Sequence, residues 1–342
     1  MPQPSRTDNP GEGSRPSRAI VVEQWGGPEV LRPGTVTVPE PQAGEILLQT
    51  ALCGVNFVDT QWRAGRFAAQ ATLPFVLGIE AAGTVLAAGS GVTRFRPGDR
   101  VAALMSSGGY AERVIAPEAR AMPLPVGWTF EQGAAFLMAF LTAFHALVTL
   151  GRLSASEAVL IHAAAGGVGT AAVQLGKALG ATVVGAVSRP EKVGLLTTLG
   201  IDHVVVTSGS GFADEVLHIT GGRGIDLVVD SIGGTVFAES LRCLAGRGRL
   251  VGIGAASGTP GTVTIAQLQL KNLSVSGLAS SVLARDPRMT EAALAVLLPL
   301  AQAGRLAPVI SDRFPLADAA RAHALLESRR STGKILLSIA GT

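Results

Sequence analysis

The sequence has few charged and aromatic residues. Charged residues make up 15% of the 342 positions, with 28 Lys and Arg against 25 Asp and Glu. The net charge of +3, without a dense basic run, argues against nucleic acid or an anionic membrane surface as a partner. The single tyrosine, Tyr110, leaves little aromatic surface for stacking on exposed bases.

Cysteines and long apolar runs are also scarce. Cys53 and Cys243 are the only cysteines and form at most one bridge, which fits a reducing cytoplasm, so we expect a cytoplasmic protein. Residues 1–17 are polar and lack the apolar segment of a signal peptide, which predicts a disordered tail. The longest apolar run, Ala134–Leu150, is short for a bilayer span and predicts a buried helix and no membrane contact.

Apolar residues make up 47% of the chain, enough for the cores of about two domains. The first third contains short apolar runs between Gly and Pro, which predict a small β-rich domain. The centre alternates strand-like and helix-like runs, typical of a doubly wound parallel sheet in an α/β protein. The expected early strands are Ala19–Trp25, Glu45–Thr50, Gly83–Ala87 and Arg100–Leu104. The expected central strands are Ala158–Ala164, Thr182–Val187, His203–Thr207, Asp226–Ser231, Arg249–Gly254 and Leu273–Leu278. The expected helices include Val168–Leu179, Glu191–Leu199 and Asp318–Leu326, and Lys334–Ile339 is expected to be the last strand.

A glycine-rich turn joins the first central strand to the following helix. Ala164, Gly166 and Gly169 match the dinucleotide-binding pattern, in which the first small residue permits the turn. The second allows the backbone to approach a pyrophosphate, and the third allows close packing of helix and strand. A structural turn alone is the alternative, but the strand before it and the helix after it favour a Rossmann-type cofactor site.

The residues after the second central strand indicate which dinucleotide binds. An NAD site usually has Asp or Glu there, about 20 residues beyond the glycine turn. This chain has Ser188, Arg189 and Lys192 instead, which suit a 2′-phosphate. Alternatively, the two cations are exposed side chains at the start of a helix and bind no ligand, although cations are unfavourable at that end of a helix. We therefore expect NADPH.

Around this turn the chain resembles the zinc-free quinone oxidoreductases of the medium-chain dehydrogenase/reductase superfamily. Their signature combines a small or acidic pair, a leucine, small residues, Gly-Gly-x-Gly, a glutamine and a basic residue. The matching residues are Ser156, Glu157, Leu160, Ala164, Ala165, Gly166, Gly167, Gly169, Gln174 and Lys177. Further blocks of the family are Gly26–Leu31, Gly54–Asp59, Gly78–Gly83, Pro97–Val101 and Leu326–Arg329.

The resemblance implies a GroES-like, β-rich catalytic domain over residues 18–137 and 300–342, and an NADP(H)-binding Rossmann domain over residues 138–299. It places Asn56 beside the nicotinamide and the substrate, and Lys192 and Arg329 at the 2′-phosphate. The residues implied at the nicotinamide half and the pyrophosphate are Thr142, Ala165, Gly166, Gly167 and Val168. Those implied to line the cofactor groove at strand ends are Ser231, Ile253 and Ala255.

The same resemblance offers a test for zinc. Zinc enzymes of the superfamily have Cys where Asn56 stands and His where Ile79 stands, and they carry a four-cysteine loop that this chain lacks. We therefore expect no metal. In two other places, Thr207 and Gln61, this chain departs from tyrosines that are common in the family. A tyrosine at Thr207 would flank the 2′-phosphate, and Arg189 is available to take over that role.

Without a metal to polarise a ketone, acceptors that take up hydride readily are favoured. We expect a quinone, with an activated C=C bond of an enone or enoyl compound, or binding of NADPH without catalysis, as alternatives. Asn56 is a candidate to hydrogen-bond an oxyanion or the nicotinamide ribose. Tyr110 either donates a proton or packs as a strand residue, and Asp59 either supports Asn56 or acts as an acid or base. The family also implies a homodimer formed near Leu273–Leu278.

Overall fold

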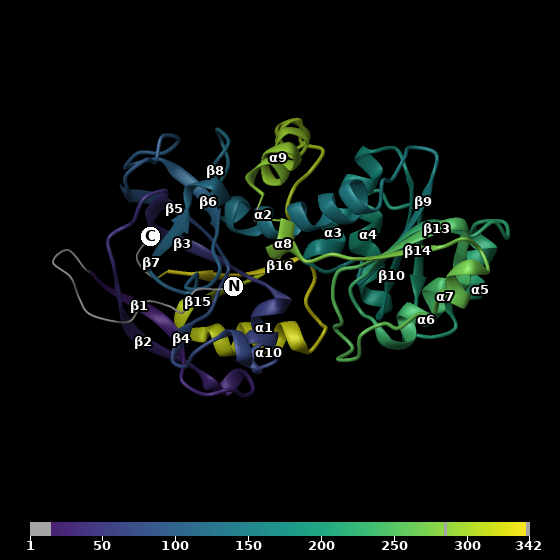
Figure 1. The fold of residues 1–342 in the computed structure, drawn as a ribbon, viewed down its shortest axis with the longest axis horizontal. Coiled ribbons are helices and arrows are strands. Elements are labelled where there is room, and N and C mark those ends of the chain that lie inside the picture. Colours follow the sequence, from purple (N-terminus) through teal and green to yellow (C-terminus); the bar gives the residue numbers. More distant parts are fainter. Residues whose placement is uncertain (1–14, 284–285, 340–342) are drawn as a thin grey trace. The chain divides into compact units, whose positions relative to one another are not determined.

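The computed structural model describes residues 15–283 and 286–339, which form two compact units (Figure 1). Unit 1 draws on Met1–Met138 and Pro308–Thr342, and unit 2 is Ala139–Ala307. The sequence places the return to the first domain at residue 300. Helix α9 (Pro287–Gln302) runs through that position and buries Leu297 and Ala301, so unit 2 extends to Ala307.

The predicted tail of residues 1–17 needs a correction. Residues 1–14 lie outside the described residues, but Arg15–Ser17 already belong to strand β1 (Arg15–Val22). They pair in antiparallel register with β2 (Leu31–Val38), with Arg15 opposite Val38. A polar composition did not prevent strand formation here, because the neighbouring strand satisfies the backbone hydrogen bonds.

Unit 1 is built from two sheets. The smaller has the strand order β2-β1-β4, and the larger, of seven strands, has the order β15-β16-β3-β5-β6-β8 with β7 paired to β3. The remaining strands are β3 (Glu45–Val55), β4 (Phe75–Val76), β5 (Glu80–Ala88), β6 (Arg100–Leu104), β7 (Arg113–Pro117), β8 (Ala121–Pro123), β15 (Ile310–Pro315) and β16 (Lys334–Ser338). The helical elements are η1 (Pro28–Val30), α1 (Phe57–Arg63), η2 (Ala68–Gln70), η3 (Glu118–Arg120), η6 (Leu316–Asp318) and α10 (Ala319–Glu327), and α2 (Phe130–Phe144) begins in this unit.

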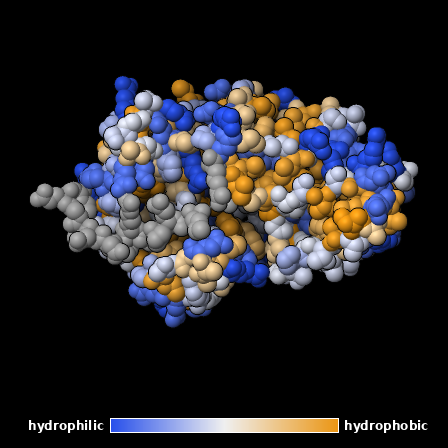
Figure 2. All heavy atoms as spheres, in the orientation of Figure 1, coloured by the Kyte–Doolittle hydropathy of each residue, from blue (hydrophilic) through white to orange (hydrophobic). Residues whose placement is uncertain are grey.

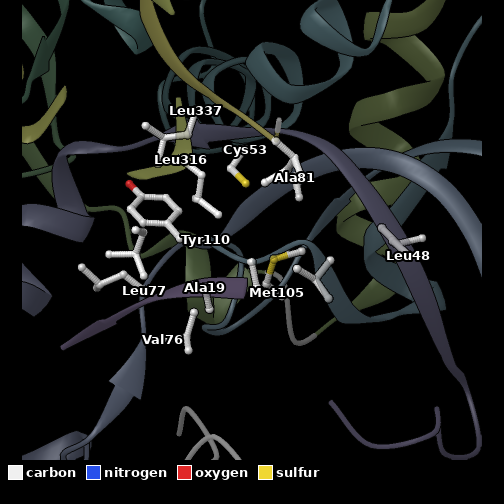
Figure 3. Packing of buried hydrophobic residues seen from close by; sticks show 14 of the residues in the cluster. Ala19, Leu48, Cys53, Val76, Leu77, Ala81, Met105, Tyr110, Leu316 and Leu337 are labelled. Carbon is white, nitrogen blue, oxygen red and sulfur yellow. The ribbon is translucent and has the colours of Figure 1, made fainter. Parts of the chain in front are cut away.

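The core of unit 1 brings both ends of the chain together. Leu316 and Leu337, from the last part of the chain, pack in one buried cluster with residues of β1, β3 and β5. Figure 3 shows the ring of Tyr110 among Leu77, Leu316 and Cys53 within this cluster. Because β16 pairs with β3, the final strand is an interior member of the large sheet and helps to position its centre.

Unit 2 contains a six-stranded parallel sheet in the order β11-β10-β9-β12-β13-β14. Its strands are β9 (Ala158–His162), β10 (Thr182–Val187), β11 (His203–Val206), β12 (Ile225–Asp230), β13 (Leu244–Gly252) and β14 (Ser274–Gly277). Its helical elements are η4 (His145–Leu150, a π-helix continuing α2), α3 (Gly167–Ala178), η5 (Pro190–Lys192), α4 (Val193–Thr198), α5 (Phe212–Ile219), α6 (Gly234–Cys243), α7 (Ile265–Gln269), α8 (Ser280–Leu283) and α9.

Helices cover both faces of this sheet (Figure 1). On one face, Leu160 and Val228 pack with Phe212 of α5 and Phe237 of α6. On the other, Gly176 of α3 approaches Val183 closely. The strand order reverses between β9 and β12, so the carboxyl ends of these strands form the switch point at which such sheets bind ligands. The predicted doubly wound parallel sheet is confirmed.

Candidate active site and cofactor site

Three neighbouring strands of unit 1 bring polar side chains to one end of the large sheet. Asn56 follows β3, Glu80 begins β5 and Lys334 begins β16. The register explains their proximity, because Ile335 pairs with Val55 and Cys53 pairs with Ala81. Residues that are far apart in the sequence therefore meet through strand pairing.

Hydrogen bonds join these three side chains into one group. The Lys334 ammonium donates to Asn56 Oδ1 and to Glu80 Oε2, each over 2.8 Å. The other carboxylate oxygen, Glu80 Oε1, accepts the backbone N–H of Met138 over 2.8 Å. Glu80 is fully buried and Lys334 is 5% exposed, whereas Asn56 is partly exposed. The buried charges are thus paired with each other, and Asn56 is the member that solvent can reach.

A second chain of hydrogen bonds continues from the backbone of Asn56. Asp59 Oδ2 accepts the Asn56 N–H over 2.9 Å and the Tyr110 hydroxyl over 2.8 Å. His323 Nε2 lies 3.1 Å from that hydroxyl oxygen, and Arg63 Nη1 lies 3.2 Å from His323 Nδ1. Because a guanidinium only donates, His323 Nδ1 is the acceptor and Nε2 carries the proton. Arg63 also forms an ion pair with Glu327 over 2.6 Å.

Burial shifts the titration of this chain. It raises the pKa of Asp59 from 3.8 to about 6, although the hydrogen bonds from Asn56 and Tyr110 act in the opposite direction. Burial, together with the charge of Asp59, raises the pKa of the Tyr110 hydroxyl well above its usual value. Burial lowers the pKa of His323 to about 3, and the Arg63 charge adds to the effect. The histidine is therefore neutral and the phenol protonated at neutral pH.

These positions bear on the three predicted catalytic residues. Asp59 and Tyr110 are both fully buried, and Tyr110 packs inside the hydrophobic core of unit 1. Their contacts favour the alternatives given from the sequence, in which Asp59 supports Asn56 and Tyr110 is a packed residue. Asn56 alone of the three is partly exposed. Of the three, only Asn56 therefore has side-chain surface that a bound molecule could reach.

The sequence reasoning missed Glu80, Lys334 and His323 as members of the site. The available signal was the presence of charge within apolar strands. Glu80 opens a run of small apolar residues, and Lys334 opens the apolar strand β16. Opposite charges on two predicted buried strands suggest an ion pair, because a buried charge is costly without a partner.

In unit 2, the glycine-rich turn has the backbone geometry that its sequence predicts. Ala163 has a positive φ of 49°, and Gly166 forms the N-cap of α3. A Cβ atom on Gly169 would lie 2.2 Å from the carbonyl oxygen of Ala163, so only glycine fits there. At Gly166 a Cβ atom would lie 3.3 Å from the same carbonyl oxygen, which is a tight contact that glycine avoids. The free N–H groups of the 12-residue helix α3 suit a pyrophosphate.

Ser188 and Arg189 directly follow β10, and Glu191 and Lys192 come two to three residues after Arg189, so the carboxylate lies beyond the tip of the strand. Ser188 and Arg189 are exposed, and Lys192 is partly exposed one turn later. Burial and the neighbouring Arg189 charge lower the pKa of Lys192, so these two cations disfavour each other. An anion between them would relieve this repulsion, which is what the 2′-phosphate of NADP(H) supplies.

The other predicted cofactor residues of unit 2 lie on neighbouring strand ends. Ser231 follows β12, while Ile253 and Ala255 follow β13. Backbone hydrogen bonds connect the two segments, from Ile253 N–H to Asp230 O over 2.7 Å and from Ala256 N–H to Ser231 O over 3.0 Å. All three residues are partly exposed at the carboxyl edge that also carries the glycine turn. Ala165 and Thr142 are buried, and Gly167 and Val168 open α3.

One predicted phosphate ligand belongs to unit 1. Arg329 follows α10, is exposed and has a positive φ of 58°. Its backbone N–H donates to Leu326 O over 3.2 Å. A non-glycine residue in this conformation carries local strain. The phosphate role of Arg329 stays a prediction.

The structure also bears on metal sites and membrane spans. Across residues 15–283 and 286–339, no three His, Cys, Asp or Glu side chains form a group that could hold a metal ion. The search covers Asn56 and Ile79, which lie within these described residues. It also covers Cys53 and Cys243, which are both free and buried. One helical run, Phe130–Leu150, is long and apolar enough to cross a bilayer, but 78% of its most apolar window is buried in the protein, as in a core helix.

Comparisons with known proteins agree with both units. The alcohol dehydrogenase GroES-like domain model matches residues 42–126, and a model described as zinc-binding dehydrogenase matches residues 199–337. A quinone oxidoreductase of Pseudomonas aeruginosa is 40% identical over 94% of this chain and 99% of its own length. An Escherichia coli quinone oxidoreductase solved with NADPH is 34% identical, with a TM-score of 0.89 over 94% of this chain and 99% of that chain. A mycobacterial protein solved with NADPH is 36% identical, with a TM-score of 0.90 over 94% of this chain and 99% of its own.

Proposed function

The chain belongs to the quinone oxidoreductase family of the medium-chain dehydrogenase/reductase superfamily, and from this premise we propose that it is a zinc-independent, NADPH-dependent quinone reductase. NADPH supplies the hydride when bound. The nearly full-length similarity to quinone oxidoreductases supports the acceptor class, and the relatives solved with NADPH support the cofactor.

The observation that carries this proposal is the pair of cations beside the glycine turn. Arg189 and Lys192 follow β10, which neighbours β9 and its turn. The turn and the start of α3 hold the pyrophosphate through backbone N–H groups, and the two cations hold the 2′-phosphate. Ser188 adds a hydroxyl at the same strand end, and Arg329 adds a further cation. Ser231, Ile253 and Ala255 line the groove at the neighbouring strand ends, and Thr142, Ala165, Gly167 and Val168 complete the nicotinamide and pyrophosphate contacts.

In unit 1, Asn56 is the contact residue of the reaction site, and Asp59 and Tyr110 hold it in place. Asn56 and Ile79 stand where the zinc enzymes of the superfamily have metal ligands, so the proposal assigns no metal. Quinones suit such a site because they accept hydride without Lewis-acid polarisation. Gln61, which is partly exposed on α1 close to Asn56, is a side chain that a substrate would meet.

The test is the oxidation of NADPH, followed by absorbance, with a panel of quinones and a panel of enones and enoyl compounds. The proposal expects turnover with quinones and a clear preference for NADPH over NADH. Turnover on the second panel alone would assign the protein as a reductase of activated C=C bonds. Tight binding of NADPH without turnover on either panel would assign it as a non-catalytic binding protein.

We further propose that the protein is a cytoplasmic homodimer that associates through the β14 edge of unit 2. In the described part of the chain, β14 is the last strand of its sheet, and nearby Ile265 and Leu270 are 71% and 83% exposed. Figure 2 shows hydrophobic surface over the region where Figure 1 places β14 and α7. An exposed strand edge with apolar neighbours favours pairing with a second copy. Sedimentation of Leu270→Lys should show monomer where the unsubstituted protein shows dimer, and an unchanged mass would contradict this interface.

A further inference from the structure

The acceptors of the proposed reaction are electrophiles, so the nucleophilic side chains of the protein are exposed to them. A quinone has ring carbons that are conjugated to its carbonyl groups, and thiolates and unprotonated amines add to such carbons. The side-chain thiols and amines of the whole chain are those of Cys53, Cys243, Lys177, Lys192, Lys271 and Lys334. All of them belong to the described residues, so the structure shows the surroundings of each.

Both thiols are shielded from such an acceptor. Cys53 and Cys243 are 0% exposed. Cys53 Sγ donates to the carbonyl oxygen of Gly109 over 2.9 Å. Cys243 Sγ donates to the carbonyl oxygen of Ser240 over 3.3 Å. Burial raises the pKa of both thiols, and that of Cys243 reaches about 12. Because the thiolate is the nucleophile, neither cysteine is set up to add to a quinone in the folded protein.

Oxygen acceptors hold the ammonium groups of three lysines. Lys334 is 5% exposed and is paired with Glu80. Lys177 Nζ lies 2.7 Å from each carboxylate oxygen of Asp202. Lys271 Nζ donates to two backbone carbonyl oxygens, over 2.9 and 2.7 Å. Each of these nitrogens would have to leave its acceptors before it could attack a carbon atom.

Lys192 has different surroundings. It ends the short helix η5 after β10, it is partly exposed, and the exposed Arg189 lies three residues before it. Burial and the Arg189 charge lower the pKa of Lys192, so a larger share of its side chain is the unprotonated amine. Lys192 therefore combines access from solvent with a neighbouring charge that favours loss of its proton.

We propose that Lys192 is a modification site, at which an electrophilic quinone adds to the amine when no nucleotide is bound and which bound NADP(H) protects. This inference rests on the proposed function for the nucleotide and for the class of acceptor. It assigns to Lys192 a second property, separate from its contact with the 2′-phosphate.

The addition balances without a further reactant. Lys192 Nζ forms a bond to a ring carbon that carries hydrogen, and the electron pair of the C=C bond moves through the conjugated carbonyl group onto its oxygen. One hydrogen of the amine and the hydrogen of the attacked carbon move as protons to the two quinone oxygens. The product is an amino-substituted hydroquinone, in which the ring is reduced and the attacked carbon is oxidised, so no outside oxidant or reductant takes part.

The modification removes a contact to the phosphate. The nitrogen becomes an aryl amine, which carries no charge at neutral pH, as after acetylation of a lysine. The ring also adds bulk beside Arg189. An excess of acceptor over NADPH therefore lowers the affinity of the protein for NADPH, whereas bound nucleotide preserves it. The site links loss of activity to depletion of the reductant.

The test is incubation of the protein with 1,4-benzoquinone, with and without saturating NADP+, which does not reduce the reagent. After removal of the reagent, mass spectrometry maps the adducts and calorimetry measures the Kd for NADPH. We expect an adduct on Lys192 and a Kd raised about tenfold or more, the loss of one charge-assisted contact. NADP+ should prevent both changes.

Two variants separate the amine from the charge. Lys192→Arg keeps a cation but has no amine that adds to a quinone, so its Kd for NADPH should be the same before and after incubation. Lys177→Arg is the matched control, because it makes the same substitution at an ion-paired lysine of α3. Its Kd should rise on incubation as in the unsubstituted protein. Thermal melts verify that each variant is folded.

Equal modification of Lys192 with and without NADP+ would overturn the inference. So would adducts on Lys177 or on the exposed His203 while Lys192 is unmodified. In these cases the proposed function stands if the untreated protein binds NADPH and reduces quinones. Failure of the untreated protein to bind NADPH overturns the proposed function, and the adduct map obtained without nucleotide still tests the addition to Lys192.

Discussion

Units 1 and 2 build their polar sites in different ways. In unit 1 the site consists of buried side chains, with Glu80 and Lys334 forming an ion pair and Asp59, Tyr110 and His323 forming a hydrogen-bonded chain. In unit 2 it consists mainly of backbone, with a glycine turn and the ends of parallel strands. A backbone site depends on local sequence, whereas a side-chain site depends on partners that are remote in the chain. The two sites should therefore fail in different ways when they are altered.

The largest effect is expected for the buried ion pair of unit 1. Lys334→Met leaves the Glu80 carboxylate buried without its partner and should lower the free energy of unfolding by about 3–5 kcal/mol. The double variant Glu80→Gln, Lys334→Met removes both charges and should recover at least half of that loss. Urea titrations measure both values. If Lys334→Met costs no more than Arg249→Met, whose ion pair in unit 2 is more exposed, this contrast between the units is wrong.

The next largest effect is expected in binding to unit 2. The double variant Arg189→Ala, Lys192→Ala should raise the Kd for NADPH about 100-fold, because it removes two charge-assisted contacts to the 2′-phosphate. The Kd for NADH and the unfolding free energy should stay nearly constant, since Arg189 is exposed and the two cations repel each other. Calorimetric titration with both nucleotides gives the ratio. An equal loss of affinity for NADH would show that these cations do not bind the 2′-phosphate.

A third prediction uses the pH dependence of unit 1. The pKa of Asp59 is raised from 3.8 to about 6. The titration of Asp59 therefore contributes fully to the free energy of unfolding below pH 3.8, and this contribution is lost as the pH rises through 6. Asp59→Asn removes this titration. As the pH rises from 4 to 7, the free energy of unfolding of Asp59→Asn should therefore increase relative to that of the unsubstituted protein, by about 3 kcal/mol at most. A constant difference across this range would mean that Asp59 titrates normally.

The smallest effect concerns unit 2 and has the opposite sign. Burial lowers the pKa of His162 to about 3, and its Nε2 lies 2.8 Å from Ser240 Oγ. In the unfolded chain His162 takes up a proton near pH 6.5. The contribution of the neutral imidazole to the free energy of unfolding is therefore present above that pH and is lost as the pH falls. Between pH 7 and pH 5 the unsubstituted protein should lose about 2 kcal/mol relative to His162→Gln, whose amide keeps the hydrogen bond to Ser240. Urea titrations at the two pH values test this, and parallel curves would contradict it.

The sequence predicts unit 2 better than unit 1, and the comparison of the two sites explains why. The strand and helix around the glycine turn were expected at Ala158–Ala164 and Val168–Leu179 and lie at Ala158–His162 and Gly167–Ala178. Hydrophobic periodicity and turn chemistry are local, so they can be read from neighbouring residues. The sequence does not predict strands such as β2 and β15, because most of their residues are exposed or partly exposed and give no apolar pattern. Both strands form through pairing with other segments of the chain.

The candidate site of unit 1 shows the same limit. Asn56 was found through the resemblance to a family, and Asp59 and Tyr110 through their residue types. Lys334 was not found, because its role depends on strand pairing between β16 and β3, which brings together residues 278 positions apart. The difference between a catalytic phenol and a packed one at Tyr110 depends on burial, which neither spacing nor composition indicates.

The pairing of the two ends of the chain in unit 1 has a consequence for recombination between homologous genes. A single crossover within the segment that encodes unit 2 would combine Glu80, Arg63 and Tyr110 of one parent with Lys334 and His323 of the other. A double crossover that exchanges residues 139–307 as one block leaves every one of these partners in its original parent. Chimeras that retain their buried contacts should therefore be those in which the nucleotide-binding unit is exchanged as a cassette.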